Sequence, residues 1–176
     1  MPVRWLDIGS GRNPVYFSLP DSLTVNKRGP RSKNWFTASY DPDPHIWSSA
    51  SDLRLPPCSV ENILFHFSVG MNRESVIDPD QLAETLLHGY DWLLPGGSVL
   101  IRSLFHGRKR FDPVPFFRCL LAAGFNSNAI DLIKCSDIEL LPEAARQILM
   151  YCEHHDLSMA DSQSAFLIAT KDYHEQ

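Results

Sequence analysis

The chain has 176 residues and a net charge of −5, and 44% of its residues are hydrophobic. This is enough apolar material for one sizeable core, so a single domain spanning residues 1–176 is expected. The acidic balance gives no indication of a general electrostatic affinity for nucleic acid or anionic membranes, although a specific RNA or DNA substrate stays open.

The sequence shows no segment that would place the protein in a membrane or direct it out of the cell. Its longest apolar runs fall well short of the about 20 residues that span a bilayer, and its first ten residues lack the apolar stretch of a signal peptide. The cysteines Cys58, Cys119, Cys135 and Cys152 are scattered without a C-x-x-C pair, which favours reduced thiols over zinc ligands or disulfides. A cytoplasmic protein without a metal site is therefore expected.

The first part of the chain combines one clear strand with a stretch that is hard to assign. Residues 3–8, VRWLDI, predict a short strand that ends in the glycine turn at 9–11. The following segment is rich in proline, lysine, arginine and asparagine, and it indicates a short helix near 15–19 and a strand at 23–27. An extended segment at 35–47 is interrupted by two prolines, because proline removes a backbone donor and restricts its predecessor.

Beyond this point, strands and helices alternate along the chain. Leu82 and Leu86 recur at helical spacing, Asp78 or Asp80 could cap that helix, and the PGG at 95–97 would end it. The predicted elements are strands at 62–68, 98–104, 129–135 and 164–171, and helices within 78–94, 113–124 and 142–155. The alternation predicts an α/β domain with a doubly wound, mostly parallel sheet and helices on both faces.

The glycine turn after the first strand is the first candidate for ligand binding. In a doubly wound sheet, ligands bind beyond the carboxyl ends of the strands, and glycines there let a ligand approach the backbone closely. The dinucleotide fingerprint G-x-G-x-x-G would need a third glycine at position 14, where the chain has Pro14. A bound pyrophosphate is therefore disfavoured, and with it a nucleotide-dependent oxidoreductase.

Several motifs resemble those of the class I S-adenosylmethionine-dependent methyltransferases, most closely the short members that open with LDIGSG. LDIGSGRNP at 6–14 is similar to the family's first motif, YDPDP at 40–44 to the acidic end of its second strand, and SDLRLPPCSVENILF at 51–65 to its adenine loop and fourth strand. WLLPGGSVLI and LLAAGF follow in the family's order. The resemblance implies a seven-stranded Rossmann-like sheet. The N-terminal helices that often cap this fold are expected to be absent, because the first strand begins almost at residue 1.

The resemblance also implies how S-adenosylmethionine would be bound. Asp7 would lie near the methionine end of the cofactor, and Asp52 would accept the adenine amino group while Leu53 packs on the ring. Asp41 would accept both ribose hydroxyls through charge-assisted hydrogen bonds, unless the strand at 23–27 is the second strand and Asn26 takes that position. The implied cofactor-binding residues are Asp7, Gly9, Ser10, Gly11, Asn13, Tyr40, Asp41, Asp52, Leu53 and Phe67.

Two histidines are candidates for catalysis. Methyl transfer from a sulfonium depends mostly on holding donor and acceptor in line, and a general base matters only when the acceptor must lose a proton. His66 near the end of the fourth strand and His106 after the fifth could supply that base, or could serve packing or surface hydrogen bonds. The Glu-His pair that many relatives carry after the fourth strand has no counterpart in SVGMN at 68–72.

The resulting hypothesis is a methyltransferase that uses S-adenosylmethionine on an unidentified acceptor. Without N-terminal cap helices the cleft would be open on one side, so the acceptor is expected to be large or to be enclosed by a partner subunit, a second copy included. The alternative is a catalytically degenerate protein of the same fold that acts as a binding partner or regulatory subunit.

Overall fold

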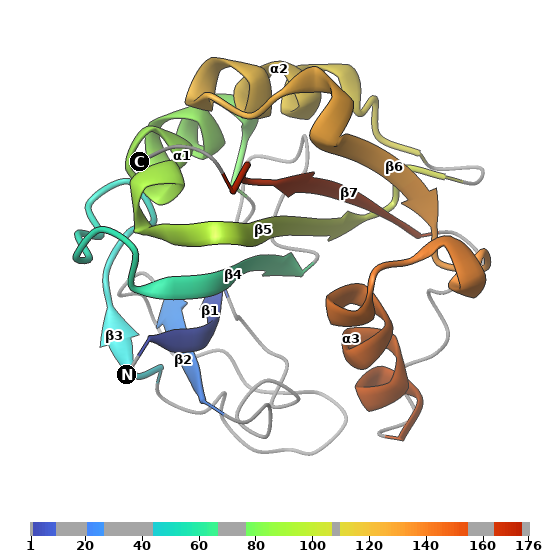
Figure 1. The fold of residues 1–176 in the computed structure, drawn as a ribbon, viewed down its shortest axis with the longest axis horizontal. Coiled ribbons are helices and arrows are strands. Elements are labelled where there is room, and N and C mark those ends of the chain that lie inside the picture. The colour runs from blue at the N-terminus through green and yellow to red at the C-terminus, as the bar shows by residue number, and fades with distance from the viewer. Residues whose placement is uncertain are drawn as a thin grey trace.

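The structure is a computed structural model, and it describes residues 2–9, 21–26, 44–66, 77–106, 110–154 and 164–173. In this part of the chain seven strands form one sheet in the order β3-β2-β1-β4-β5-β7-β6 (Figure 1). The strands are β1 (Val3–Ile8), β2 (Ser22–Asn26), β3 (Ile46–Trp47), β4 (Val60–His66), β5 (Leu93–Ser103), β6 (Ile130–Lys134) and β7 (Ala165–Thr170).

The sheet is mostly parallel, as predicted, but it is mixed at one end. The strands β1 to β5 pair in parallel with their neighbours. The last strand in the chain, β7, lies between β5 and β6 and runs antiparallel to both. The apolar run at 164–171 predicted a buried strand but not its direction, because a strand buried on both faces reads the same in either orientation.

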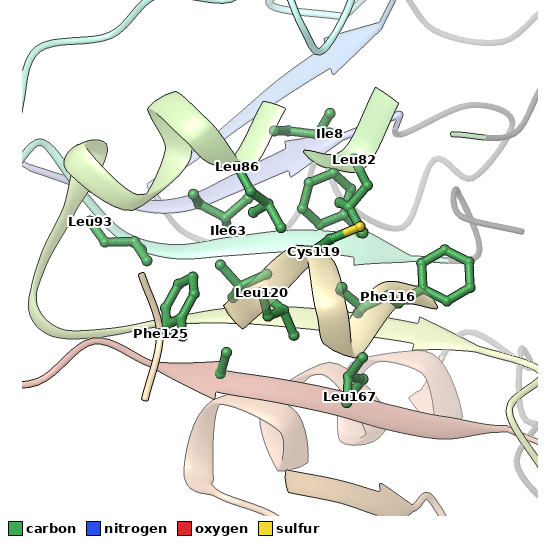
Figure 2. Close-up of a cluster of buried hydrophobic side chains, with 14 of the residues drawn as sticks. Ile8, Ile63, Leu82, Leu86, Leu93, Phe116, Cys119, Leu120, Phe125 and Leu167 are labelled. Atoms are coloured by element: carbon green, nitrogen blue, oxygen red, sulfur yellow. The ribbon is translucent and has the colours of Figure 1, made fainter. Parts of the chain in front are cut away.

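Helices cover both faces of the sheet (Figure 1), and each face has its own apolar core. The helices α1 (Pro79–Trp92) and α2 (Val114–Ala123) pack together over one face, where Figure 2 shows Leu86, Phe116 and Ile63 meeting in one cluster. The helix α3 (Glu143–His154) packs on the other face, over a smaller core. Short 3-10 turns lie at Ser127–Ala129 and Ile138–Leu140.

The start of α1 follows its local sequence closely. Asp78 is the N-cap, so of the two predicted caps it is Asp78 and not Asp80 that fills this role. Its side chain accepts a hydrogen bond from the Gln81 backbone N–H at 2.9 Å, and the Gln81 side chain accepts one from the Asp78 N–H at 3.3 Å. This reciprocal pair satisfies two backbone donors at the helix start.

The transition from α1 to β5 differs from the prediction. The helix ends at Trp92, and the PGG segment lies inside the first part of β5. Leu93 pairs with Val60 while Ser98 pairs with Asn62, so the register shifts and the glycines form a bulge. A Cβ on Gly97 would lie 2.5 Å from the Glu61 carbonyl oxygen, which explains why glycine is needed there.

A buried lysine joins the end of β7 to the end of α1. The Lys171 ammonium donates to the carbonyl oxygens of Tyr90 at 2.9 Å and Leu93 at 3.2 Å. It also lies 4.6 Å from the centre of the Tyr90 ring. The cation thus satisfies carbonyls that a helix C-terminus leaves without partners inside the helix.

Candidate functional site

Several of the predicted site residues that the structure describes lie at the carboxyl edge of the parallel strands. Strand β1 pairs with β2 along one of its edges and with β4 along the other. Strand order therefore reverses at β1, and such a switch point is where open α/β sheets bind their ligands. The residues at this edge that the structure describes include Asp7, Gly9, Asn26 and His66.

Asp7 lies near the end of β1 with its carboxylate sealed from solvent. The residue is 1% exposed, and within the described part of the chain neither carboxyl oxygen has a hydrogen-bond partner. This burial raises the pKa of the Asp7 carboxyl well above its ordinary value. Because buried polar side chains almost always have partners, this carboxylate at a sheet edge is a candidate for contact with a ligand.

Gly9 begins the turn that follows β1. Its φ of 73° is in the left-handed region, and its N–H donates to the Val25 carbonyl oxygen at 2.8 Å. This conformation costs a glycine little and a side chain more, so the structure explains the first glycine of the motif. Ser10, Gly11 and Asn13 lie outside the described residues.

The second strand of the sheet is not the one that the YDPDP motif predicts. The strand next to β1 is β2, which pairs with it in parallel and ends at Asn26. The position that follows the second strand thus falls at Asn26, the alternative that the sequence left open. Tyr40 and Asp41 come later in the chain, before β3, and lie outside the described residues. A ribose-binding role for Asp41 stays a prediction.

Asp52 lies in the loop after β3, and its side chain is exposed. The Ser49 hydroxyl donates to the Asp52 carboxylate at 2.5 Å, and the Asp52 N–H donates to the Ser49 hydroxyl at 3.3 Å. These bonds hold the loop in a fixed turn. The next residue, Leu53, is buried in the core beneath α1 and α2, so most of its surface packs against the protein itself. The adenine contacts of both residues stay predictions.

The two candidate histidines have different surroundings. His66, the last residue of β4, is buried, and its Nε2 lies 3.1 Å from the Arg102 Nη1 in β5. Burial and the neighbouring Arg102 cation lower the pKa of the His66 ring well below its ordinary value. His106 follows β5 and is half-buried. Phe67, directly after His66, lies outside the described residues.

Arg102 was not among the predicted site residues, although its place in the sequence carries one signal. The residue is the only charged one in SVLIRSL, a run that otherwise predicts a buried strand. An arginine is rarely buried without partners. Within the structure it is 1% exposed and bonded to neighbouring side chains.

The fold of this chain is similar to that of several solved structures. An S-adenosylmethionine-dependent methyltransferase from Archaeoglobus fulgidus matches 97% of this chain and 86% of its own, at 17% identity and a TM-score of 0.54. The chain has the fold of the class I methyltransferases. The observed strand order, with an antiparallel β7 between β5 and β6, matches that fold. The fold class expected from the motifs is therefore confirmed.

Two further solved structures of this fold have bound ligands or partners. Phosphoethanolamine N-methyltransferase 2 from Haemonchus contortus, in complex with S-adenosyl-L-methionine, matches 98% of this chain at 14% identity and a TM-score of 0.52, and this chain spans 49% of it. A protein in complex with the Trm112 methyltransferase activator of Haloferax volcanii matches 100% of this chain and 86% of its own, at 13% identity and a TM-score of 0.55. No protein-family model and no curated protein sequence matches the chain.

Proposed function

We propose that this chain binds S-adenosylmethionine at the carboxyl edge of its sheet and transfers the methyl group to an acceptor. The observation that carries the proposal is the Asp7 carboxylate, which is buried beside the left-handed Gly9 without a hydrogen-bond partner in the described part of the chain. A ligand that brings positive charge and hydrogen-bond donors to this point would supply what the protein does not. S-adenosylmethionine carries a sulfonium, an ammonium and the donors of its ribose.

The chain's own residues would divide the work of binding. Asp7 would accept hydrogen bonds from the ligand, Gly9 would let the ligand approach the backbone, and the loop fixed by Ser49 would present Asp52 at the same edge. The bound cofactor would supply an already activated methyl group, so the protein's main task is to hold the acceptor in line with it. None of the helices in the described ranges is long and apolar enough to cross a membrane.

The second candidate is a binding partner or regulatory subunit. One of the solved structures with this fold is held in a complex with a methyltransferase activator, which supports an assembled form for this chain as well. In this alternative the site at Asp7 binds the ligand, and this chain does not transfer the methyl group itself. Ligand binding without methyl transfer to any acceptor, in the presence of its partner, would favour this candidate.

Isothermal titration calorimetry with S-adenosylmethionine and with its demethylated product, S-adenosylhomocysteine, tests the proposal. We expect both to bind, and we expect Asp7→Asn to weaken binding by at least about tenfold, because hydrogen bonds to a charged group contribute about 1.5–3 kcal/mol. Asp131→Asn changes an exposed carboxylate in β6 and is the matched control. Absence of heat with both ligands would refute the proposal, and unchanged affinity in Asp7→Asn would refute the role of Asp7.

The pH dependence of binding gives a second measurement. A cationic ligand beside Asp7 lowers the pKa that burial has raised, so binding should release a proton. Affinity should then rise with pH by up to about tenfold per pH unit below the raised pKa and become constant above it. Asp7→Asn should remove this slope. Titrations in buffers of different ionisation enthalpy would count the released proton directly.

A further inference from the structure

A row of polar side chains follows the apolar core on the face of the sheet that α3 covers. Trp5, Leu64 and Leu100 belong to that core. Asp7, His66 and Arg102 come two residues after these on the same strands, β1, β4 and β5. Side chains two residues apart on a strand share a face, so the three polar residues lie on the α3 face, nearer the carboxyl edge. On the opposite face the corresponding side chains, Ile8, Phe65 and Ile101, are apolar and buried. The polar row therefore belongs to one face and to the edge where the ligand is proposed to bind.

Arg102 lies at the β5 end of this row and is fixed on several sides. Its Nε and Nη2 each lie 3.3 Å from the Ser164 hydroxyl, just before β7, and its guanidinium carbon lies 5.8 Å from the centre of the Phe166 ring. The Ser164 hydroxyl in turn donates to the Cys135 sulfur at 3.1 Å. Since that hydroxyl has one proton, it accepts from Arg102. These contacts leave the guanidinium little freedom to turn away from His66.

The contact between Arg102 and His66 determines where the histidine proton lies. A guanidinium has only donors and stays protonated in proteins, so Nη1 donates and the His66 Nε2 accepts over the 3.1 Å between them. The neutral ring must then carry its proton on Nδ1. A protonated ring would instead direct an N–H at a guanidinium inside the protein, which burial and charge repulsion both disfavour.

We propose that Arg102 is a positioning residue that holds His66 as a neutral ring with its proton on Nδ1 and its Nε2 occupied, so that His66 is not the general base of the reaction. The acceptor part of this inference rests on the proposed methyl transfer, whereas the state of the ring does not. To act as a base through Nε2, His66 would have to break its bond with Arg102. If the acceptor needs a base, His106 is the better candidate of the two histidines, since it is half-buried and follows β5.

Nuclear magnetic resonance of the protein with isotopically labelled histidine ring nitrogens tests the proposal without any acceptor. At neutral pH we expect the His66 Nδ1 to have the chemical shift of a protonated nitrogen and Nε2 that of an unprotonated one. The His66→Asn variant assigns the signals. The same state should persist below the ordinary histidine pKa of about 6.5. A proton on Nε2, or a charged ring at neutral pH, would overturn the proposal.

The Arg102→Met variant tests whether Arg102 is the cause. Without the guanidinium, we expect the His66 pKa to rise toward its ordinary value and the Nε2-protonated form to appear. Arg118→Met removes an exposed arginine of α2 and should leave the His66 spectrum unchanged. A His66 spectrum that is the same in Arg102→Met as in the parent would overturn the positioning role. If Arg102→Met does not fold, the spectrum of the parent protein still decides the state of the ring.

Two readouts keep this inference separate from the proposed function. Failure of both ligands to bind in calorimetry would refute the proposed function while leaving the ring spectrum as expected. Once an acceptor is known, His66→Asn should lower the transfer rate by no more than about tenfold, because the proposal gives His66 no proton to accept. Loss of a general base would instead cost about a hundredfold to ten-thousandfold, and a loss of that size in His66→Asn would overturn the inference.

Discussion

The two faces of the sheet differ in how they use their polar groups. Under α1 and α2 the core stays apolar through Ile8, Phe65 and Ile101, and a buried cation on that face, Lys171, lies at the opposite edge with its ammonium bonded to backbone carbonyls. Under α3 the apolar core stops earlier, and Asp7, His66 and Arg102 follow it. The first face therefore serves mainly stability. The second gives up apolar packing at one end to hold groups that can interact with a ligand.

The largest effect should come from emptying the core of the first face. Leu86 in α1 is fully buried, whereas its neighbour Leu87 is 61% exposed. We expect Leu86→Ala to lower the free energy of unfolding by about 2–5 kcal/mol, and Leu87→Ala to change it by less than about 0.5 kcal/mol. Urea unfolding followed by circular dichroism measures both. Comparable losses in the two variants would show that the first face is not organised as described.

A smaller effect should follow from removing the buried cation of the first face. Lys171→Met keeps the length and apolar part of the side chain but leaves the carbonyls of Tyr90 and Leu93 without this donor. We expect a loss of about 1.5–3 kcal/mol in the free energy of unfolding. Ligand affinity of the folded protein should not change, since Lys171 lies at the other edge of the sheet. A loss of affinity without loss of stability would contradict the division between the faces.

The smallest effect should appear on the second face, and with the opposite sign. Burial raises the pKa of the Asp7 carboxyl in the folded state. The protonated carboxyl therefore contributes its full stabilisation below the unfolded pKa of about 3.9, and this contribution is lost as the pH rises through the folded pKa. Asp7→Asn should remove this decline and stabilise the unliganded protein at neutral pH by roughly 1–2 kcal/mol, while it weakens ligand binding. Urea unfolding over a pH series measures the difference. A variant less stable than the parent at neutral pH would mean that Asp7 has a stabilising partner.

Much of the fold could be predicted from local sequence because its elements carry strong and independent signals. The spacing of Leu82 and Leu86 and the cap at Asp78 defined α1, and the apolar run at 62–68 defined β4 to within two residues at each end. The position of β2 was harder, since its five residues resemble the extended segment at 35–47 and the YDPDP motif lies in the latter. Which of two short segments pairs with β1 depends on contacts across the sheet, and local sequence does not contain them.

The candidate site also contains residues that local sequence predicts and a contact that it does not. Asp7 and Gly9 were predictable because a motif places both at the end of one strand, and the structure gives each a distinct state, a buried carboxylate and a left-handed backbone. The bond between Arg102 and His66 was not predictable, because it joins neighbouring strands whose register the sequence does not state. The roles of Asp41, Asp52 and Leu53 in cofactor binding stay predictions.

The reversed direction of β7 has a practical consequence for handling the molecule. Because this strand runs back across the sheet, residues 171–173 emerge beside Gly96, at the same edge where β1 begins with Val3 (Figure 1). Asp7 and His66 lie at the far edge. A surface tether or fluorescent label placed near Val3 or near residues 171–173 would thus face away from the proposed binding edge. Immobilised protein should therefore keep that edge open to ligands in the surrounding solution.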